Sequence, residues 1–461
     1  MTQSQPTTCF ASPLCVSVRS TTFTLPLSCA AKRQPTANAP PRTPTATLAR
    51  PRTIADPSLF PILSEIVNDK PLVYLDSAAT SQKPRQVIDA ILSYYAATNS
   101  NVHRGAHSLA SRATDAFEHT RDLIANLINA NSRDEVVYTR NATEAINLVA
   151  NTWALHNLQK GDTIIVSVME HHANLVPWQM IASRTGAKVV AVPLTPQQTY
   201  DIHAYKRLME QHCVRLVACS HVSNVLGCIN PVRQIVEEAR KHQALVLLDA
   251  CQSVPHMPVD VQQLDVDFLV ASAHKMCGPT GVGFLYGKQH ILEDMPPFLG
   301  GGEMIHDVFI DSSTYAKPPH KFEAGTPAIG EVVGFAAAIE YLQSIGMDKI
   351  HHFETEMAQY LYNRLTAFQE VEVYGPPPPR AALCAFNVKG VHSGDLAVML
   401  DLEGVAVRSG HHCAQPLHRE LGINSSARAS LYIYNSPDEV DKFIDALKES
   451  VDLLGGTLTL K

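Results

Sequence analysis

The sequence predicts an α/β fold with a mostly parallel sheet in a large domain, followed by a smaller α+β domain at the C-terminus. Three observations support this fold class: short apolar runs alternate with helical patterns, polar residues or Gly and Pro bound each run, and the alternation stops near Gly325. Short, continuously apolar runs suit strands that are buried on both faces of a parallel sheet. The alternation of strand and helix therefore indicates such a sheet with helices packed against it.

Six apolar runs are predicted to form the strands of the large sheet: Val136–Thr139, Thr163–Val168, Lys188–Val192, Leu216–Ser220, Leu245–Asp249 and Phe268–Ala271. The helical patterns between these runs are Asn141–Leu158, Leu175–Thr185, Ala204–Gln211 and Pro231–His242. A helix over about Gly330–Ile345 leads out of the sheet. The smaller domain is expected to contain helices near Asp348–Phe368 and Pro437–Leu454, strands Ala382–Val388 and Val405–Ser409, and a Pro-rich surface loop at Gly375–Pro379.

The first 55 residues differ from the rest of the chain, because no Asp or Glu precedes Asp56 and because Ser, Thr, Pro, Ala and scattered basic residues dominate. This composition is typical of an organelle transit peptide. The many prolines oppose a continuous amphipathic helix, which favours a plastid over a mitochondrial address. A disordered tail without an address is the alternative. The apolar stretch Cys9–Val18 has no positive charge before it, so a secretory signal is the weaker interpretation.

We therefore expect four parts. Residues 1–55 form the transit segment, residues 56–75 pack with the small domain, residues 76–325 form the large domain and residues 326–461 form the small domain. The formal net charge is -7 and no Lys/Arg run stands out, so a nucleic-acid partner is not expected. No run of 18 apolar residues occurs, so no membrane-spanning helix is expected. The ten cysteines are scattered singly, which suits a reducing compartment better than a disulfide framework.

Polar or ionisable groups follow five of the predicted strands. In an open α/β sheet, ligands bind beyond the carboxyl ends of the strands, so these groups are expected to share one rim. A lysine at such a strand end is partly desolvated, which frees its amine for Schiff-base chemistry; the alternative is an ordinary solvated lysine. The five strand ends supply Thr143, His171, Asn224, Asp249 and Lys275.

Asp249 and Thr143 each allow two interpretations. Asp249 follows an apolar run, and a buried carboxylate needs a positive partner such as a pyridinium nitrogen. Asp249 could instead be the N-cap of the following segment. Thr143 lies at a predicted helix N-terminus, where free N–H groups and a hydroxyl bind phosphate, although it could also simply cap that helix.

Several long motifs resemble one family. The segment Ala271–Gly283 (ASAHKMCGPTGVG) is similar to the pyridoxal-phosphate (PLP) lysine motif of the class V aminotransferase superfamily. Further segments resemble the cysteine desulfurases of that superfamily: Tyr74–Ser81 (YLDSAATS), Met169–Trp178 (MEHHANLVPW), Ser220–Gly227 (SHVSNVLG), Phe322–Pro327 (FEAGTP) and Arg408–Pro416 (RSGHHCAQP). The match spans about Pro57–Leu454, and the RSGHHCAQP form resembles group II, or SufS-type, enzymes. The resemblance implies a PLP-dependent transferase of fold type I.

The resemblance also implies roles for individual residues around the cofactor. Lys275 carries PLP as a Schiff base and later moves protons, while Asp249 pairs with the pyridinium nitrogen. Gln252 hydrogen-bonds the phenolic oxygen, and His171 stacks on the ring and acts in acid–base steps. The phosphate is held by Thr143, Ser272 and His274, with Thr326 reaching over from a partner subunit.

The substrate side is implied in the same way. Asn224 and Arg428 bind the substrate carboxylate, Arg428 as a bidentate fork, and Arg408 and His103 lie at the substrate site. Cys413 is the sulfur acceptor. By itself Cys413 would be read as a buried apolar residue, but its loop composition and the nearby Arg408 favour a reactive thiol.

Metal binding is disfavoured at two other places. Adjacent residues such as His411, His412 and Cys413 rarely converge on one ion. No acidic residue accompanies the i,i+4 pair His103 and His107 in that segment.

The resemblance thus implies a PLP-dependent cysteine desulfurase that converts L-cysteine to L-alanine with a persulfide on Cys413. It further implies a homodimer, a SufE-type acceptor protein, a role in iron–sulfur cluster assembly, selenocysteine lyase activity and, with the transit segment, the plastid stroma. Two alternatives remain. Another PLP enzyme of this fold, such as a small-amino-acid aminotransferase or a kynureninase-like hydrolase, needs no thiol at Cys413. A catalytically inactive scaffold would not be expected to keep the whole set of candidate residues.

Overall fold

The computed structural model describes residues 54–461, so nearly all of the predicted transit segment lies outside the described residues. Within the described part, no helix is both long and apolar enough to cross a membrane.

A seven-stranded sheet forms the centre of the fold, with the strand order β4-β10-β9-β8-β7-β5-β6. Its strands are β4 (Val136–Thr139), β5 (Asp162–Ser167), β6 (Lys188–Val192), β7 (Cys213–Ser220), β8 (Leu245–Asp249), β9 (Phe268–Ser272) and β10 (Gly283–Gly287). Strands β5 to β9 pair in parallel, whereas β10 runs antiparallel to both β4 and β9. The predicted parallel sheet is confirmed, and all six predicted strands point the same way. Only β10 was not predicted.

Helices cover both faces of this sheet. Alternate strand residues point to opposite faces, and both sets are apolar here. On one face, Ile164, Leu216 and Leu247 pack with α3 (Ala142–Val149) and α5 (Val176–Thr185). On the other face, the strands pack with a second group of helices. That group comprises α2 (Ser108–Leu127), α6 (Ile202–Gln211), α7 (Val232–Lys241) and α10 (Ile329–Ile345).

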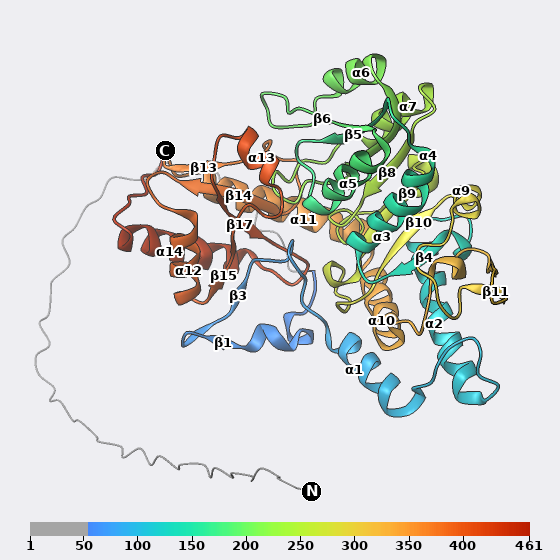
Figure 1. Ribbon diagram of the computed structural model, residues 1–461. Helices are drawn as coiled ribbons and strands as arrows, with labels where there is room; N and C mark the ends of the chain where they lie inside the picture. The colour runs from blue at the N-terminus through green and yellow to red at the C-terminus, as the bar shows by residue number, and fades with distance from the viewer. Residues whose placement is uncertain (1–53) are drawn as a thin grey trace, which may run out of the picture. The chain divides into compact units, whose positions relative to one another are not determined.

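The C-terminal part is built on a four-stranded antiparallel sheet of order β13-β14-β17-β16 (Figure 1). Its strands are β13 (Val371–Val373), β14 (Leu383–Val388), β16 (Arg408–Gly410) and β17 (Ser426–Ser430). Helices α11 (Met347–Thr366), α12 (Ser393–Leu402) and α14 (Pro437–Leu453) pack with it. Ser436 and Glu439 form a capping box that starts α14, as Ser at an N-cap favours.

One predicted strand is wrong. The single strand expected over Val405–Ser409 is two short strands, because β15 (Val405–Ala406) pairs in parallel with β3 (Val73–Tyr74), whereas β16 pairs with β17. The chain therefore changes partner at Val407. The remaining elements are α1 (Arg85–Ser93), α4 (Leu155–Asn157), α8 (Val261–Leu264), α9 (Gln289–Asp294), α13 (Gln415–Glu420), β1 (Ile66–Val67), β2 (Lys70–Pro71), β11 (Ile305–Val308) and β12 (Ser313–Tyr315).

Candidate active site

A cavity of about 200 Å³ lies at the carboxyl ends of the parallel strands. This is the rim at which the strand-end residues were expected to meet. Side chains from the C-terminal sheet also reach the cavity, so residues far apart in the sequence share it. The predicted site residues that line it are Thr143, His171, Asn224, Asp249, Gln252, Ser272, His274, Lys275, Arg408 and Arg428.

Lys275 is held in place by the peptide that precedes it. Lys275 ends a 3-10 turn that follows β9 directly. The carbonyl oxygen of His274 accepts hydrogen bonds from Thr80 Oγ1 (3.0 Å), from the Ser81 amide (3.0 Å) and from Lys83 Nζ (3.1 Å). Burial lowers the pKa of Lys83 to about 8. Sequence reasoning missed Lys83, although it lies just beyond the YLDSAATS motif.

One carboxylate, that of Asp249, and one imidazole, that of His171, face the cavity from the strand ends. Asp249 is buried at the end of β8, and the Cys251 amide donates to its Oδ1 at 3.0 Å. His171 uses Nδ1 to accept the Ala173 amide at 3.1 Å. Burial, and then the positive charge of Lys275, lower the pKa of His171 to about 4, so its ring is neutral at physiological pH. Gln252 lines the same cavity, and its Nε2 donates to the carbonyl oxygen of Ala78 at 2.8 Å.

The N-terminus of α3 forms an anion cradle. Ser272 Oγ accepts the Ala142 amide at 2.9 Å, which ties the helix start to the end of β9. Gly283 is needed for this approach, because a Cβ there would lie 2.7 Å from the Ala271 carbonyl oxygen and 2.8 Å from Asn141 Cα. Thr143 and His274 line the cavity next to this cradle. Free helix N–H groups with nearby hydroxyls are a phosphate site.

These residues fit PLP. The cavity offers a lysine for the aldehyde, a carboxylate for the ring nitrogen, a neutral imidazole ring for stacking and a helix N-terminus with hydroxyls for the phosphate. Each group was predicted from the sequence, and the structure brings all of them to one cavity.

Arg428 lines the cavity from the C-terminal sheet. This side chain on β17 is buried; its Nη1 donates to the Asn224 carbonyl oxygen at 3.0 Å and its Nη2 to Asp76 Oδ1 at 3.0 Å. Its buried Nε has no hydrogen-bond partner among residues 54–461. An unpaired buried donor is costly, and a substrate carboxylate would satisfy it. Asp76 is a further residue that sequence reasoning missed, although it lies inside the YLDSAATS motif.

The side chain of Asn224 has a partner among the described residues, and its predicted contact with a substrate carboxylate stays a prediction. It lines the cavity, but its Nδ2 donates to the carbonyl oxygen of His412 at 2.9 Å. Asn224 therefore connects the cavity to the loop that precedes α13, which contains Cys413.

Cys413 lies beside the cavity. Its side chain is half-buried, and Arg408 Nη2 lies 3.8 Å from its Sγ. Arg408 itself lines the cavity, so one guanidinium connects the thiol to the Lys275 site. A cation next to sulfur stabilises the negative charge of a thiolate, which is the nucleophilic form.

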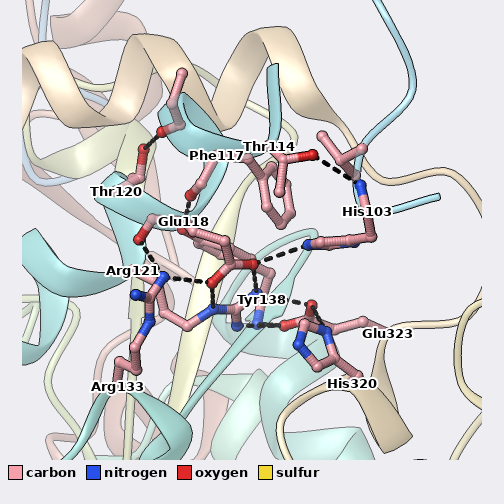
Figure 2. Close-up of polar contacts among 12 residues, drawn as sticks. His103, Thr114, Phe117, Glu118, Thr120, Arg121, Arg133, Tyr138, His320 and Glu323 are labelled. Carbon is pink, nitrogen blue, oxygen red and sulfur yellow. Dashed lines mark hydrogen bonds and ion pairs between the residues drawn. The ribbon is translucent and has the colours of Figure 1, made fainter. Parts of the chain in front are cut away.

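His103 and Thr326 lie outside this cavity in the single chain. Thr326 lines a second cavity of about 540 Å³ together with Arg140 and Phe298. Its predicted action across subunits stays a prediction. His103 adopts a positive φ of 69° and its Nε2 lies 3.0 Å from Glu118 Oε1 (Figure 2).

Glu118 belongs to an ion-pair network. Arg121 contacts both carboxylate oxygens of Glu118, at 3.0 and 3.1 Å, and both oxygens of Glu323, at 2.7 and 3.0 Å (Figure 2). Arg133 Nη2 lies 2.7 Å from Glu118 as well. His103, Glu118 and His320 are close enough together for a metal ion. Two guanidinium groups already neutralise Glu118, however, so the cluster joins α2 to the segment before α10 as an ion-pair network.

His103 and His107 do not share a helix. His107 is the N-cap of α2, and its Nδ1 accepts the Ala110 amide at 3.3 Å. The i,i+4 spacing of these two histidines therefore does not place them on one helix face.

Comparisons with known proteins agree with the geometry. Residues 73–443 match the family Aminotransferase class-V. A "Probable cysteine desulfurase" of Synechocystis sp. is 55% identical over 395 residues, covering 85% of this chain and 94% of that protein. A "Cysteine desulfurase" of Haloferax volcanii is 49% identical over 385 residues, covering 83% of this chain and 90% of that protein.

A solved structure supports the same family. The crystal structure of a cysteine desulfurase from Escherichia coli, in its S-sulfonic acid form, has a TM-score of 0.80 and 40% identity, and covers 86% of this chain and 97% of that one. The chain therefore belongs to the class-V aminotransferase family and, within it, to the cysteine desulfurases, with pyridoxal phosphate as its cofactor.

Proposed function

We propose that this cysteine desulfurase converts L-cysteine to L-alanine and receives the sulfur of its substrate as a persulfide on Cys413. One observation carries the proposal: Arg408 lines the Lys275 cavity and lies 3.8 Å from the Cys413 thiol. A nucleophilic thiol thus stands at the rim of a cavity that fits PLP. The reactions of an aminotransferase or a kynureninase-like hydrolase do not need a thiol at Cys413.

The residues of the chain divide the reaction between them. Arg428, which lines the cavity, holds the substrate carboxylate through its guanidinium group. When bound, the cofactor supplies an electron sink for negative charge at the substrate α-carbon. Lys275 removes and returns protons at that carbon. Asp249 would keep the ring nitrogen of the bound cofactor protonated, and the neutral His171 ring would stack on the cofactor and exchange protons with the substrate.

Sulfur transfer then occurs at Cys413. Its thiolate attacks the substrate sulfur, so an S–S bond forms while the carbon–sulfur bond of the substrate breaks. The electron pair of the broken bond stays with the substrate β-carbon, which takes up a proton. The resulting amino acid leaves as alanine. The products are L-alanine and a persulfide on Cys413.

Incubation of the purified holoenzyme with L-cysteine, followed by an alanine assay, tests this proposal. The wild type is expected to form alanine. Lys275→Ala should lose both the chromophore that borohydride reduces and the alanine. Cys413→Ala should keep the cofactor absorbance but form no persulfide. Full sulfide release by Cys413→Ala would overturn the role of Cys413. A wild type that forms no alanine would indicate a scaffold protein.

We further propose that a SufE-type protein accepts the sulfur. The Cys413 thiol is half-buried and its backbone is tied to the His172 segment, so an acceptor must come to the persulfide. Addition of such an acceptor should raise the rate of steady-state alanine formation. An unchanged rate would contradict this partner.

We also propose that the sulfur supplies iron–sulfur cluster assembly. Cluster formation on an apo-scaffold, with L-cysteine as the sulfur source, tests this proposal.

Selenocysteine lyase activity is proposed for the same site. Selenium is more polarisable than sulfur and leaves carbon more readily, while the groups that hold the carboxylate serve either substrate. L-selenocysteine should therefore yield alanine with the same holoenzyme. No alanine from L-selenocysteine would contradict this activity.

We propose a homodimer from two features. The turn between β11 and β12 exposes large apolar side chains, with Val308 56% and Phe309 59% exposed and Ile310 fully exposed. Such an exposed apolar tip is typical of an interaction surface. Thr326, the predicted phosphate ligand, lines a cavity other than that of Lys275. Sedimentation of the holoenzyme should give a dimer, and the double substitution Phe309→Ser and Ile310→Ser should shift it toward the monomer. A monomeric wild type would contradict the proposal.

A plastid location is proposed from the composition of residues 1–55. A fluorescent fusion of residues 1–60 should enter plastids. A fusion that stays in the cytosol would contradict the proposal.

A further inference from the structure

The backbone of the Cys413 loop is strained. His412 and Cys413 have positive φ values of 50° and 58°, and neither residue is glycine. Residues with a Cβ adopt this left-handed backbone region at a cost in free energy. Two such residues in a row persist only where surrounding contacts hold them. The structure must therefore contain contacts that fix this loop.

Two of these contacts come from one residue, His172. Its amide nitrogen donates to the carbonyl oxygen of Cys413 at 2.7 Å. Its ring Nε2 lies 3.0 Å from the amide nitrogen of Gln415, which donates to it. His172 therefore holds the chain at the second strained residue and again two residues later.

The ring of His172 replaces a missing helix cap. Helix α13 begins at Gln415, and its N-cap residue is Ala414, whose side chain makes no capping hydrogen bond. The first amides of a helix have no partner within the helix, and an alanine has no atom with which to supply one. The imidazole of His172, which lies 243 residues earlier in the sequence, accepts the hydrogen bond of the Gln415 amide instead.

His172 is suited to act as an acceptor. Burial, and then the neighbouring His411, lower its pKa from the ordinary histidine value, so the ring is neutral at physiological pH. A neutral imidazole offers one ring nitrogen as an acceptor, whereas the protonated ring offers none. His172 also follows His171 directly, so the same short turn presents one ring to the cofactor cavity and the other to the Cys413 loop.

We infer that His172 is a positioning residue for the sulfur-transfer step: it holds the backbone of Cys413 so that the thiol stays beside Arg408 at the cavity rim. This inference rests on the proposed role of Cys413 as the sulfur acceptor. His172 itself is not among the residues that line the Lys275 cavity. Its contribution is to keep the strained loop in the one conformation that aims the thiol at the substrate sulfur.

Two substitutions separate the hydrogen bond from the shape of the ring. His172→Phe keeps a planar ring but removes the acceptor, whereas His172→Gln keeps an oxygen acceptor at a similar reach. Gln415→Ala is the matched control on the other side of the bond, because it leaves the backbone amide in place. The main-chain bond from residue 172 to Cys413 is present in all of these variants.

The rate of persulfide formation on Cys413 is measured in a single turnover of the holoenzyme, and steady-state kcat and KM are measured for L-cysteine. In His172→Phe the persulfide rate and kcat should fall roughly three- to tenfold, the effect of losing one neutral hydrogen bond. KM should change less than twofold, because the groups that hold the substrate carboxylate are untouched. His172→Gln should recover most of the rate, and Gln415→Ala should match the wild type.

The reactivity of Cys413 supplies a readout independent of turnover. Alkylation by iodoacetamide, followed by mass spectrometry of the Cys413 peptide, should be several-fold faster in His172→Phe than in the wild type, since the released thiol moves into solvent. The cofactor absorbance should be the same in all variants. Equal persulfide and alkylation rates in His172→Phe and wild type would overturn the inference, as would an equal loss in His172→Phe and His172→Gln. A wild type that forms alanine without a persulfide would instead overturn the role of Cys413.

Discussion

The buried side chain of Arg428 forms an ion pair with the partly exposed Asp76, which joins the C-terminal sheet to the segment after β3, with Arg428 Nη2 3.0 Å from Asp76 Oδ1. The side chain of Arg428 is 1% exposed and that of Asp76 is 24% exposed. This pair holds the guanidinium at the lining of the Lys275 cavity, where we propose that it binds the substrate carboxylate.

Replacement of Asp76 by Ala should destabilise the protein. The buried guanidinium of Arg428 would lose its counter-charge, and breaking a buried pair in this way costs about 3 kcal/mol. Urea unfolding of the holoenzyme measures the change in the free energy of unfolding. Asp89→Ala on the exposed face of α1 is the control, with an expected change within about 0.5 kcal/mol. A change at Asp76 no larger than that at Asp89 would show that the pair does not support the fold.

Replacement of Arg428 by Lys should raise KM for L-cysteine about 10- to 100-fold, because the ammonium keeps the charge but loses the planar fork. Cofactor absorbance should persist, since Arg428 does not belong to the cofactor cradle. Steady-state alanine formation gives KM. If Arg428→Lys keeps the wild-type KM, another group binds the carboxylate.

His221 should make the protein sensitive to acid. Burial lowers its pKa to about 4, and its Nδ1 has no hydrogen-bond partner in the described residues. Between about pH 6.5 and pH 4 the unfolded chain binds a proton at this residue and the folded chain does not, so the free energy of unfolding falls as pH falls through that window. In His221→Leu, the loss of stability between pH 7 and pH 5 should be about 2 kcal/mol smaller than in the wild type.

Urea unfolding at both pH values measures this difference. At pH 8 the ring is neutral in both states and contributes nothing to the pH dependence. Parallel pH profiles of the wild type and His221→Leu would contradict the assignment.

Gly283→Ala should weaken cofactor binding. The added Cβ would lie 2.7 Å from the Ala271 carbonyl oxygen and 2.8 Å from Asn141 Cα, so the N-terminus of α3 must move away from Ser272. The affinity for PLP should fall about tenfold or more, because about one charge-assisted hydrogen bond to the phosphate is lost. Titration of the apoenzyme with PLP measures this change. Gly300→Ala is the control, since no atom lies within 4 Å of a Cβ built there.

Much of the fold follows from local sequence patterns. The runs Val136–Thr139 and Leu245–Asp249 are strands with the predicted bounds, because residues buried on both faces of a sheet form an unbroken apolar signal. Lys188–Val192 also has its predicted bounds, although this edge strand is largely exposed or half-buried. β10 was missed because its residues, GFLYG, carry two glycines and continue the lysine motif. Their strand state depends on antiparallel pairing with β4 and β9.

The candidate site was predictable where a motif names the residue. Lys275, His171 and Asn224 lie in segments that resemble a family, and the cavity brings them together. The supporting contacts were not predictable in this way. Arg428 and Asp76 are 352 residues apart, and the amide that His172 accepts belongs to a residue 243 positions later. Such contacts depend on how the two sheets meet, which no local pattern encodes.

The most direct test of the central claim is mass spectrometry of the Cys413 peptide after a single turnover with L-cysteine, with alanine measured in the same sample. The account predicts one added sulfur atom on Cys413 for each alanine formed, and neither product in Lys275→Ala. Alanine formed with the added sulfur on another cysteine, or with none on the protein, would contradict it.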